Sequence, residues 1–412
     1  MVTTAIIVVS GESRLSPLTQ VSGLSLLKRA VLTAQKAGAT TCYIVLDHDR
    51  LDLQRELQHD ARVTCRVVWV QSSSGLLPEE RPAGICLVFA IDTIFRHPLI
   101  HTLSQQTVPE NMAVLSDASG APALALVPSS YVPTILTELA QGLLLRDTTP
   151  VKNSDTLQLA VPPGSFLCRL TPDSSLARVE YDILLSLENP RDGFVDRHVN
   201  RKFSRPMTRL LLRTPLTPNQ ITVLAGLASL LGALCFFPGG YYGPLLGALL
   251  FQFSAVLDCC DGEIARCKMM ESPLGDWLDI VCDTAGAIAI FLGIGIAVWQ
   301  NGEGAHALRL AGVLVLGGLS AFPLVTLAEN TEEAGKRQGG WEDVVIKKLL
   351  LSLTNRDFSI LILVSAAVGN LSWFLWGAAI GAHVFWLTLA WLLYRAGRLG
   401  RLRSIRERKE II

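Results

Sequence analysis

Apolar segments of membrane length recur through the second half of the chain, and they restrict its possible folds more than any other feature. Hydrocarbon offers no water to hydrogen-bond the backbone, so a segment that crosses it must be a helix whose own N–H and C=O groups pair. The segments are Gln220–Phe237, Tyr242–Leu257, Ile280–Trp299, Leu308–Ala328 and a long run, Phe358–Tyr394. The second half is therefore predicted to be an all-α membrane domain.

The long run at the end needs to be divided. A single helix over Phe358–Tyr394 would be roughly 55 Å long, whereas the hydrocarbon core is about 30 Å thick. Gly369 and Asn370 are turn residues within the run, so it is predicted to cross twice. The resulting six transmembrane helices place both ends of the domain on the same side.

The basic residues agree with this count, because Lys and Arg are concentrated in the segments that it assigns to the cytosol. These are Arg197, Arg201, Lys202, Arg205, Arg209 and Arg213 before the first span, and Arg395, Arg398, Arg401, Arg403, Arg406, Arg408 and Lys409 after the last. Met1–Ser10 has neither a basic n-region nor a small-residue cleavage site. We therefore expect a multi-pass protein of a prokaryotic cell membrane with both termini in the cytosol.

Before about residue 190 the apolar runs are short and interrupted by Pro, Gly, Ser and charge, which is typical of a water-soluble α/β domain. Ala5–Val9 and Cys42–Leu46 are predicted strands, with a helix over Leu24–Lys36 between them. The predicted domains are residues 1–185 in the cytosol, 186–215 as an interfacial amphipathic helix, and 216–412 in the membrane. The formal net charge of zero argues against a nucleic-acid partner.

Four aspartates interrupt the apolar half at depths where charge is costly. They occur in Asp258-Cys-Cys-Asp261-Gly262-Glu-Ile-Ala-Arg266 and, after eight residues, in Gly275-Asp-Trp-Leu-Asp279-Ile-Val-Cys-Asp283. Each charge at the centre of a span costs about 2.5 to 3.5 kcal/mol, so four that face lipid would cost on the order of 10 kcal/mol. They are therefore expected to face the protein interior and to be neutralised there.

The spacing of the aspartates places them in pairs on helix faces. Asp258 and Asp261 are three residues apart and Asp279 and Asp283 are four apart, so each pair shares one face. Two such faces, opposed, form a cage of four carboxylates, and hard oxygen ligands of this kind suit Mg²⁺ or Mn²⁺. Four carboxylates can hold two ions, which together clamp both oxygens of an in-line phosphoryl displacement. The implied substrate is a pyrophosphate.

Glycines and an arginine beside the aspartates fit a nucleotide. Gly262 and Gly275 remove side chains where a nucleotide backbone approaches closely, and Arg266 supplies a cation for phosphate. In a purely structural interpretation the first two aspartates cap helix ends and pair with Arg266 and Lys268. That interpretation explains neither the glycines nor the last aspartate.

The pattern DxxDGxxAR, eight residues and GxxxDxxxD resembles the signature of the CDP-alcohol phosphotransferase family, with all eight fixed positions present over 26 residues. Looser similarity in the basic stretch before residue 216, in Leu216–Thr222 and in Asn355–Asp357 extends the resemblance to most of residues 180 to 400. Asp276 and Glu263 fall at variable positions of the pattern. Glu263 is expected either to pack or to face solvent.

The resemblance implies an enzyme in which the hydroxyl of an acceptor attacks the β-phosphorus of a CDP-alcohol and releases CMP. The acceptor would be a phosphorylated polyol or a lipid alcohol. The resemblance implies Asp258, Asp261 and Asp279 as metal ligands, with Asp283 beside them in the metal site as the general base. It further implies nucleotide contacts from Asn219, Gly262, Ala265, Arg266 and Gly275, acceptor contacts from Lys202 and Arg356, and a homodimer.

The first domain resembles nucleotidyltransferases of the sugar-phosphate or inositol-phosphate cytidylyltransferase kind, whose first loop is glycine-rich and is followed by Lys-Pro. This chain keeps only Gly11 in the loop and has Ser16-Pro17 in place of Lys-Pro. Asp92 follows an apolar run where the resemblance implies a metal aspartate, although an aspartate at a strand end is more often a turn or cap residue. The domain is therefore predicted to be degenerate, a scaffold or a weak nucleotide or dimer contact.

Three functions remain open from the sequence. The favoured one is a phosphotransferase with a single activity. The second is a bifunctional enzyme that makes CDP-inositol in the cytosol and uses it at the membrane, against which the missing lysine counts. The third is a transporter or membrane scaffold without catalysis, whose intramembrane acids conduct ions.

Overall fold

The computed structural model describes residues 2–9, 15–46, 51–71, 84–106, 113–116, 122–132, 134, 157–159, 161–162, 165–171, 174–187, 192–334, 345–347, 349–350 and 357–396. It divides into two compact units. One consists of Met1–Leu187 with Cys267–Met270, and the other of Glu188–Arg266 with Glu271–Ile412. Each unit has its own core of buried side chains.

The first unit contains a mixed sheet whose described strands run in the order β10-β8-β9-β6-β1-β4-β5. The strands are β1 (Val2–Val9), β4 (Thr41–Leu46), β5 (Arg66–Gln71), β6 (Ile85–Ala90), β8 (Ala113–Ser116), β9 (Pro122–Pro128) and β10 (Leu157–Leu159). Strand β1 pairs in parallel with both β4 and β6, and β9 is antiparallel to β6 and β8. Because the chain order reverses at β1, the carboxyl ends of β1 and β6 form the position where open α/β sheets bind ligands.

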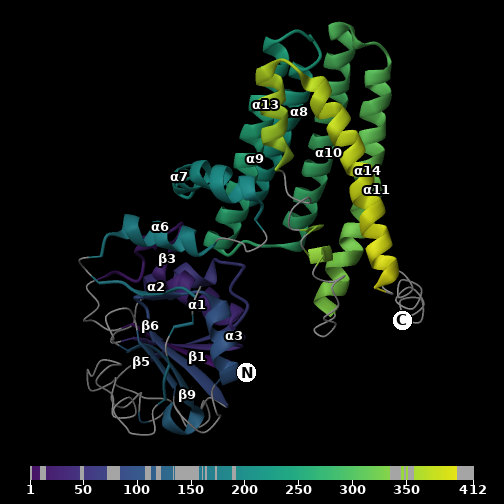
Figure 1. Ribbon diagram of the computed structural model, residues 1–412. Helices are drawn as coiled ribbons and strands as arrows, with labels where there is room; N and C mark the ends of the chain where they lie inside the picture. Colours follow the sequence, from purple (N-terminus) through teal and green to yellow (C-terminus); the bar gives the residue numbers. More distant parts are fainter. Residues whose placement is uncertain are drawn as a thin grey trace. The chain divides into compact units, whose positions relative to one another are not determined.

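Four described helices accompany this sheet: α1 (Leu26–Lys36), α2 (Leu51–Gln58), α3 (His97–Gln106) and α6 (Leu176–Ser186), of which α1 and α3 lie beside the sheet in Figure 1. Two short ribbons complete the unit, β2 (Gln20–Val21) with β3 (Leu24–Ser25), and β7 (Thr93–Phe95) with β11 (Leu167–Arg169). The predicted strand–helix–strand start is confirmed. The helix begins at Leu26 because the Ser25 hydroxyl accepts from the Lys28 N–H, 3.3 Å away.

The second unit is a bundle of apolar helices: α8 (Pro218–Cys235), α9 (Tyr242–Lys268), α10 (Pro273–Val298), α11 (His306–Ala334), α13 (Phe358–Val368) and α14 (Leu371–Arg395). A shorter helix, α7 (Arg201–Leu211), precedes them and follows one π-helical segment, η4 (Asp196–Asn200). Among the described residues five helices are long and apolar enough to cross a membrane, all except α7 and α13 of those named here. The predicted multi-pass, all-α class of this half is confirmed.

The predicted turn within the last apolar run is also confirmed. Helix α13 ends at Val368, Gly369 adopts a left-handed φ of 76°, and α14 begins at Leu371. The 11 described residues of α13, the fifth of these six helices, extend only about 16 Å, which is less than the hydrocarbon thickness of about 30 Å. Of the two helices in this run, only α14 has membrane length by itself.

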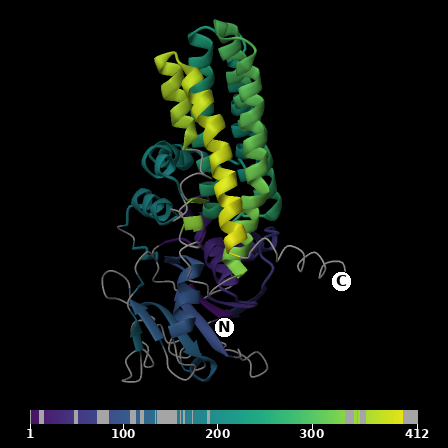
Figure 2. The same cartoon turned by 45° about the vertical axis from the view of Figure 1, so that its right-hand side comes forward.

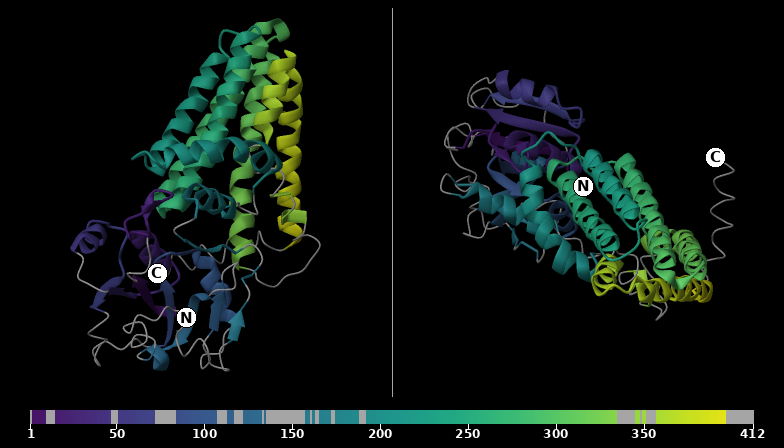
Figure 3. Two further views of the ribbon diagram at one scale, coloured as in Figure 1. Left: turned by 90° about the vertical axis from the view of Figure 1, so that its left-hand side faces the viewer. Right: turned by 90° about the horizontal axis from the view of Figure 1, so that it is seen from above.

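Helices α8 and α9 pack closely against each other. A Cβ on Gly247 of α9 would lie 2.6 Å from the Gly232 carbonyl oxygen of α8, so these two backbones touch. One turn before Gly232 on α8, the Ser229 hydroxyl lies 2.7 Å from the Ser254 hydroxyl of α9. Figure 2 shows α14, in yellow, alongside α11, in green, and the right-hand view of Figure 3 shows the helices from above.

The starts of α8 and α10 are fixed by their first residues. Helix α8 is capped by Thr217, whose hydroxyl accepts from the Gln220 N–H, and Pro218 is its first helical residue. In the same way the Ser272 hydroxyl accepts from the Gly275 N–H before Pro273. Helix α10 therefore begins well before the apolar stretch at Ile280.

Candidate active site

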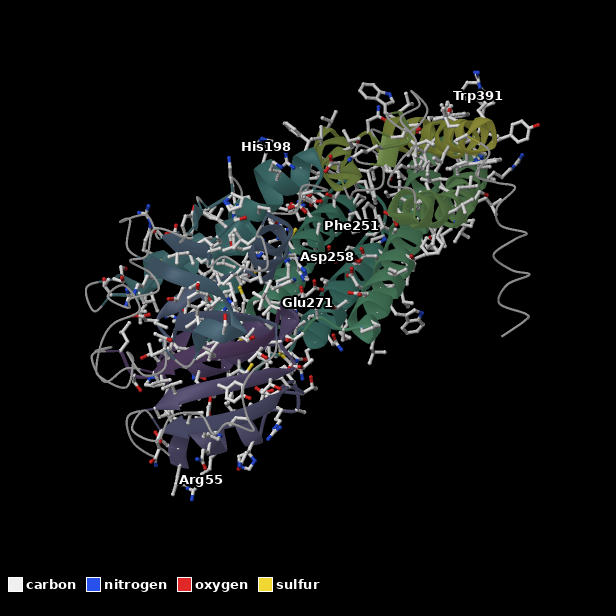
Figure 4. All side chains as sticks on the ribbon, turned by 90° about the horizontal axis from the view of Figure 1, so that it is seen from below. Arg55, His198, Phe251, Asp258, Glu271 and Trp391 are labelled. Carbon is white, nitrogen blue, oxygen red and sulfur yellow. The ribbon has the colours of Figure 1, made fainter. Side chains whose placement is uncertain are left out.

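Three of the four signature aspartates come together between α9 and α10. One oxygen from each of Asp258, Asp261 and Asp279 lies within 4.8 Å of the other two. Asp261 is 8% exposed, and the other two are half-buried. Figure 4 shows Asp258 within the helices, whereas Trp391 of α14 projects from their outer edge. Three hard oxygen donors converging at one point fit a divalent cation.

Thr222 is a member of this site that the sequence analysis did not identify. Its hydroxyl donates to Asp261 Oδ2 at 2.6 Å, from the first turns of α8. A hydrogen bond to a charged oxygen is shorter and stronger than a neutral one, so it fixes the rotamer of Asp261. The available signal was spacing, because Thr222 lies three residues after Asn219 and shares its helix face.

The residues expected to contact nucleotide form two pairs. A Cβ on Gly262 would lie 3.3 Å from an Arg266 guanidinium nitrogen, and a Cβ on Gly275 would lie 3.1 Å from Asn219 Oδ1. Each glycine therefore leaves room for the polar side chain beside it. Arg266 Nε is buried and has no hydrogen-bond partner within the described part of the chain. A buried donor without a partner is costly, and an anionic phosphate would satisfy it.

The remaining predicted site residues are placed as follows. Asp283 lies one turn beyond Asp279 on α10, half-buried, and is not among the three grouped carboxylates. Ala265 is half-buried on α9, and Lys202 is exposed on α7. Arg356 lies outside the described residues. Of this set, Asp283 is the one that shares a helix face with a grouped carboxylate, Asp279.

Glu263, expected to pack or to face solvent, is instead the buried end of an ion pair. Its side chain is 1% exposed, and its Oε1 lies 2.8 Å from an Arg201 guanidinium nitrogen on α7. Arg201 also binds Asp192 at 3.0 Å. Although burial by itself opposes the charged form, these two acids raise the pKa of Arg201 above its ordinary value.

Asp92, the metal aspartate implied for the first unit, follows β6 at the sheet position described above. It is 7% exposed, and its Oδ2 lies 3.3 Å from Arg169 Nε. Burial raises the pKa of Asp92, and Arg169 partly offsets this effect. Its Oδ1 is buried without a hydrogen-bond partner in the residues that the structure describes. Gly11, in the loop after β1, lies outside those residues. Because Arg169 occupies one oxygen, Asp92 is a poor fit to a metal.

Residues 215–394 match the family model described as CDP-alcohol phosphatidyltransferase. All eight signature positions lie within this segment, and it includes the three grouped carboxylates. Residues 215–394 are a CDP-alcohol phosphatidyltransferase domain. This CDP-alcohol phosphatidyltransferase domain therefore accounts for helices α8, α9, α10, α11, α13 and almost all of α14.

Two relatives show how far the similarity extends. A bifunctional IPC transferase and DIPP synthase of Aquifex aeolicus is 37% identical over 113 residues, 27% of this chain and 25% of its own length. A phosphatidylinositol phosphate synthase of Mycobacteroides abscessus is 26% identical over 167 residues, 40% of this chain and 74% of its own length. The chain matches only 20% to 29% of the length of the first four curated relatives.

Among solved structures, the inositol-1-phosphate CTP transferase of T. maritima is similar to 43% of this chain over 94% of its own length, with 12% identity and a TM-score of 0.30. The family assignment of the CDP-alcohol phosphatidyltransferase domain rests on the matched residues 215–394 and their signature.

Proposed function

We propose that this protein transfers a phosphoalcohol group from a CDP-alcohol to the hydroxyl of an acceptor and releases CMP, at the cytosolic side of a membrane. The convergence of Asp258, Asp261 and Asp279 at the ends of two apolar helices carries this proposal. Carboxylates at such depth are costly unless cations neutralise them, and their oxygens suit Mg²⁺ or Mn²⁺. Membership of residues 215–394 in the family supports the same reaction class.

The bound cations, which we propose to be two, would neutralise the charge on the pyrophosphate that is attacked. Asp258, Asp261 and Asp279 would hold them, and Thr222 keeps Asp261 in position. Arg266 would pair with a phosphate oxygen above Gly262, and Asn219 would contact the cytidine beside Gly275. Ala265 would leave space on the same helix.

Asp283 is proposed as the general base. The oxygen of the acceptor hydroxyl forms a bond to the β-phosphorus as the bond from that phosphorus to the bridging oxygen breaks. CMP leaves with the bridging oxygen, and the hydroxyl proton passes to Asp283. A carboxylate one turn from a metal ligand on the same helix face is well placed for this transfer.

The acceptor is proposed to be a phosphorylated polyol, because the M. abscessus relative is named a phosphatidylinositol phosphate synthase. Inositol phosphate is the first compound to test, followed by glycerol phosphate and a lipid alcohol. Lys202, which is exposed, and Arg356, which lies outside the described residues, are proposed contacts for the acceptor phosphate. We also propose a homodimer in a prokaryotic cell membrane, with both termini cytosolic and with segments 1–185, 186–215 and 216–412 as its domains.

The test is a matrix of CDP-alcohol donors and acceptors with full-length protein in detergent, with Mg²⁺ or Mn²⁺ and CMP release as the readout. At least one pair is expected to release CMP. Asp261→Asn should abolish release, whereas Asp276→Asn, at an exposed position of α10 outside the signature, should retain it. Absence of CMP from every pair, with ion flux through protein reconstituted in liposomes, would support the transporter alternative instead.

The first unit is proposed to be a non-catalytic scaffold. Asp92 is paired with Arg169, and Ser16-Pro17 stands where the resembling enzymes have Lys-Pro. Both observations favour a scaffold over a bifunctional enzyme. The discriminating measurement uses the full chain with Asp283→Asn, so that the membrane half is silent. Pyrophosphate release from CTP and inositol phosphate by this variant would restore the bifunctional alternative.

A further inference from the structure

A buried carboxylate lies inside the signature segment without being one of its fixed positions. Glu263 comes two residues after Asp261 on α9 and is 1% exposed. A carboxylate buried this deeply must be neutralised and fully hydrogen-bonded, or its desolvation would destabilise the fold. The partners that satisfy Glu263 therefore determine how this part of α9 is held.

All of the hydrogen-bond partners described for Glu263 come from one face of α7. Arg201 and Ser204 donate to Oε1 at 2.8 and 2.9 Å, and the Thr208 hydroxyl donates to Oε2 at 2.5 Å. The three residues are spaced three and four apart, so they align along one face of the helix. The Asp192 carboxylate in turn accepts from Arg201 Nε at 3.0 Å. Both members of the ion pair, Glu263 and Arg201, thus have further hydrogen-bond partners.

Helix α9 is consequently held from two directions. Successive residues of a helix are rotated by about 100°, so Asp261 and Glu263 point to nearly opposite faces. Asp261 is bound by Thr222 on α8, and Glu263 is bound by α7. With both contacts made, the segment that carries Asp258 and Asp261 cannot roll about its axis without breaking one of them.

We propose that Glu263 is a positioning residue whose anchorage to Arg201, Ser204 and Thr208 of α7 sets the rotation of α9 and preforms the metal-binding cluster. The inference rests on the proposed phosphotransferase function and its divalent metal centre. Metal affinity depends on ligands being held at the correct separation, and loss of groups that orient the ligands typically weakens metal binding by about 10- to 100-fold. Glu263 therefore controls metal affinity without contacting the metal.

The test is direct Mn²⁺ binding to full-length protein in detergent, by titration of free Mn²⁺ with electron paramagnetic resonance. Glu263→Gln should weaken binding by about 10- to 100-fold, and Thr208→Val, which keeps the shape and loses the hydroxyl, by about tenfold. Thr208→Ser should restore the wild-type affinity. If Glu263→Gln does not fold, the two Thr208 variants carry the test.

Ser254→Ala is the matched control. It also removes a buried hydroxyl contact of α9, the 2.7 Å contact with Ser229 of α8, but leaves the α7 contacts intact. It should lower the melting temperature without changing Mn²⁺ affinity. Wild-type affinity in Thr208→Val and Glu263→Gln together with lowered melting temperatures would overturn the inference, since Glu263 would then stabilise the fold only. If wild-type protein binds no Mn²⁺, the proposed metal centre itself is wrong, and this inference falls with it.

Discussion

The Thr222 hydroxyl donates to Asp261 Oδ2 at 2.6 Å and so joins α8 to the carboxylate cluster on α9 and α10. Thr222 is itself 4% exposed. A buried hydrogen bond to a carboxylate oxygen restricts the orientation of that carboxylate and leaves its other oxygen for a cation. The cluster therefore depends on three helices, although its oxygens come from two.

This relationship predicts that Thr222→Val weakens Mn²⁺ binding by about tenfold, because Asp261 loses the group that orients it. Thr222→Ser keeps the hydroxyl and should bind as the wild type does. Thr326→Val is a suitable control, since it removes a hydroxyl that donates to the Phe322 carbonyl within α11, away from the carboxylate cluster. Equal Mn²⁺ affinity for Thr222→Val and wild type would show that Asp261 is oriented without this bond.

Asp283→Asn is predicted to separate catalysis from metal binding. CMP release should fall by about 10²- to 10⁴-fold, because the amide cannot accept the proton of the acceptor hydroxyl. Mn²⁺ affinity should change little, since the three grouped carboxylates are Asp258, Asp261 and Asp279. A large loss of Mn²⁺ affinity in Asp283→Asn would instead identify Asp283 as a metal ligand.

Gly275→Ala is predicted to raise the KM for the CDP-alcohol on the order of tenfold by displacing a contact group. The added Cβ would lie 3.1 Å from Asn219 Oδ1 and 3.2 Å from Ser272 Oγ, so Asn219 must move. Gly312→Ala on α11 is the matched control, because within the described part of the chain its Cβ would meet no atom within 4 Å beyond the backbone of its own helix. Steady-state CMP release with varied donor measures both variants. An unchanged KM in Gly275→Ala would remove Asn219 from the donor site.

In the first unit, the contribution of Asp60 to the stability of the fold is predicted to depend on pH. The hydrogen bond from Arg62 Nε, 2.7 Å away, lowers the pKa of Asp60, with Lys28 adding to the effect from 3.7 Å. The folded state therefore binds this proton less tightly than the unfolded state. Its stabilisation is present above the unfolded pKa of about 3.9 and is lost as the pH falls through the lowered folded value.

Asp60→Asn should accordingly lower the melting temperature by roughly 2–4 °C at pH 7, if the pair contributes about 1 kcal/mol. The difference from wild type should shrink as the pH approaches 3. Circular dichroism of the full-length protein at both pH values measures it. Asp182→Asn is the control, because its pair with Arg178 is exposed and exposed pairs stabilise little. If Asp60→Asn lowers the melting temperature equally at both pH values, the stabilisation does not come from the lowered pKa of Asp60.

Much of the fold followed from local rules. The α/β start, the apolar helices, the Thr217 cap and the turn at Gly369 each depend on residues close together in the chain, through periodicity, capping and glycine conformations. Hydropathy shows that a segment can lie in lipid but not that its helix is long enough to cross it, and of the two helices in the last run only α14 has membrane length. The signature aspartates were placed on helix faces for the same local reason.

The chain's sequence by itself determined which residues are the candidates for the site, since four acids in an apolar half must face one another or a cation. Only the tertiary structure decided their division: three carboxylates grouped, Asp283 one turn away, Asp261 bound by Thr222, and Glu263 buried against α7. In the other unit, the partner of Asp92 was likewise known only from the structure: it is Arg169, 77 positions later in the chain. Spacing along one helix fixes a face, whereas the partner of that face comes from another helix whose approach no local pattern encodes.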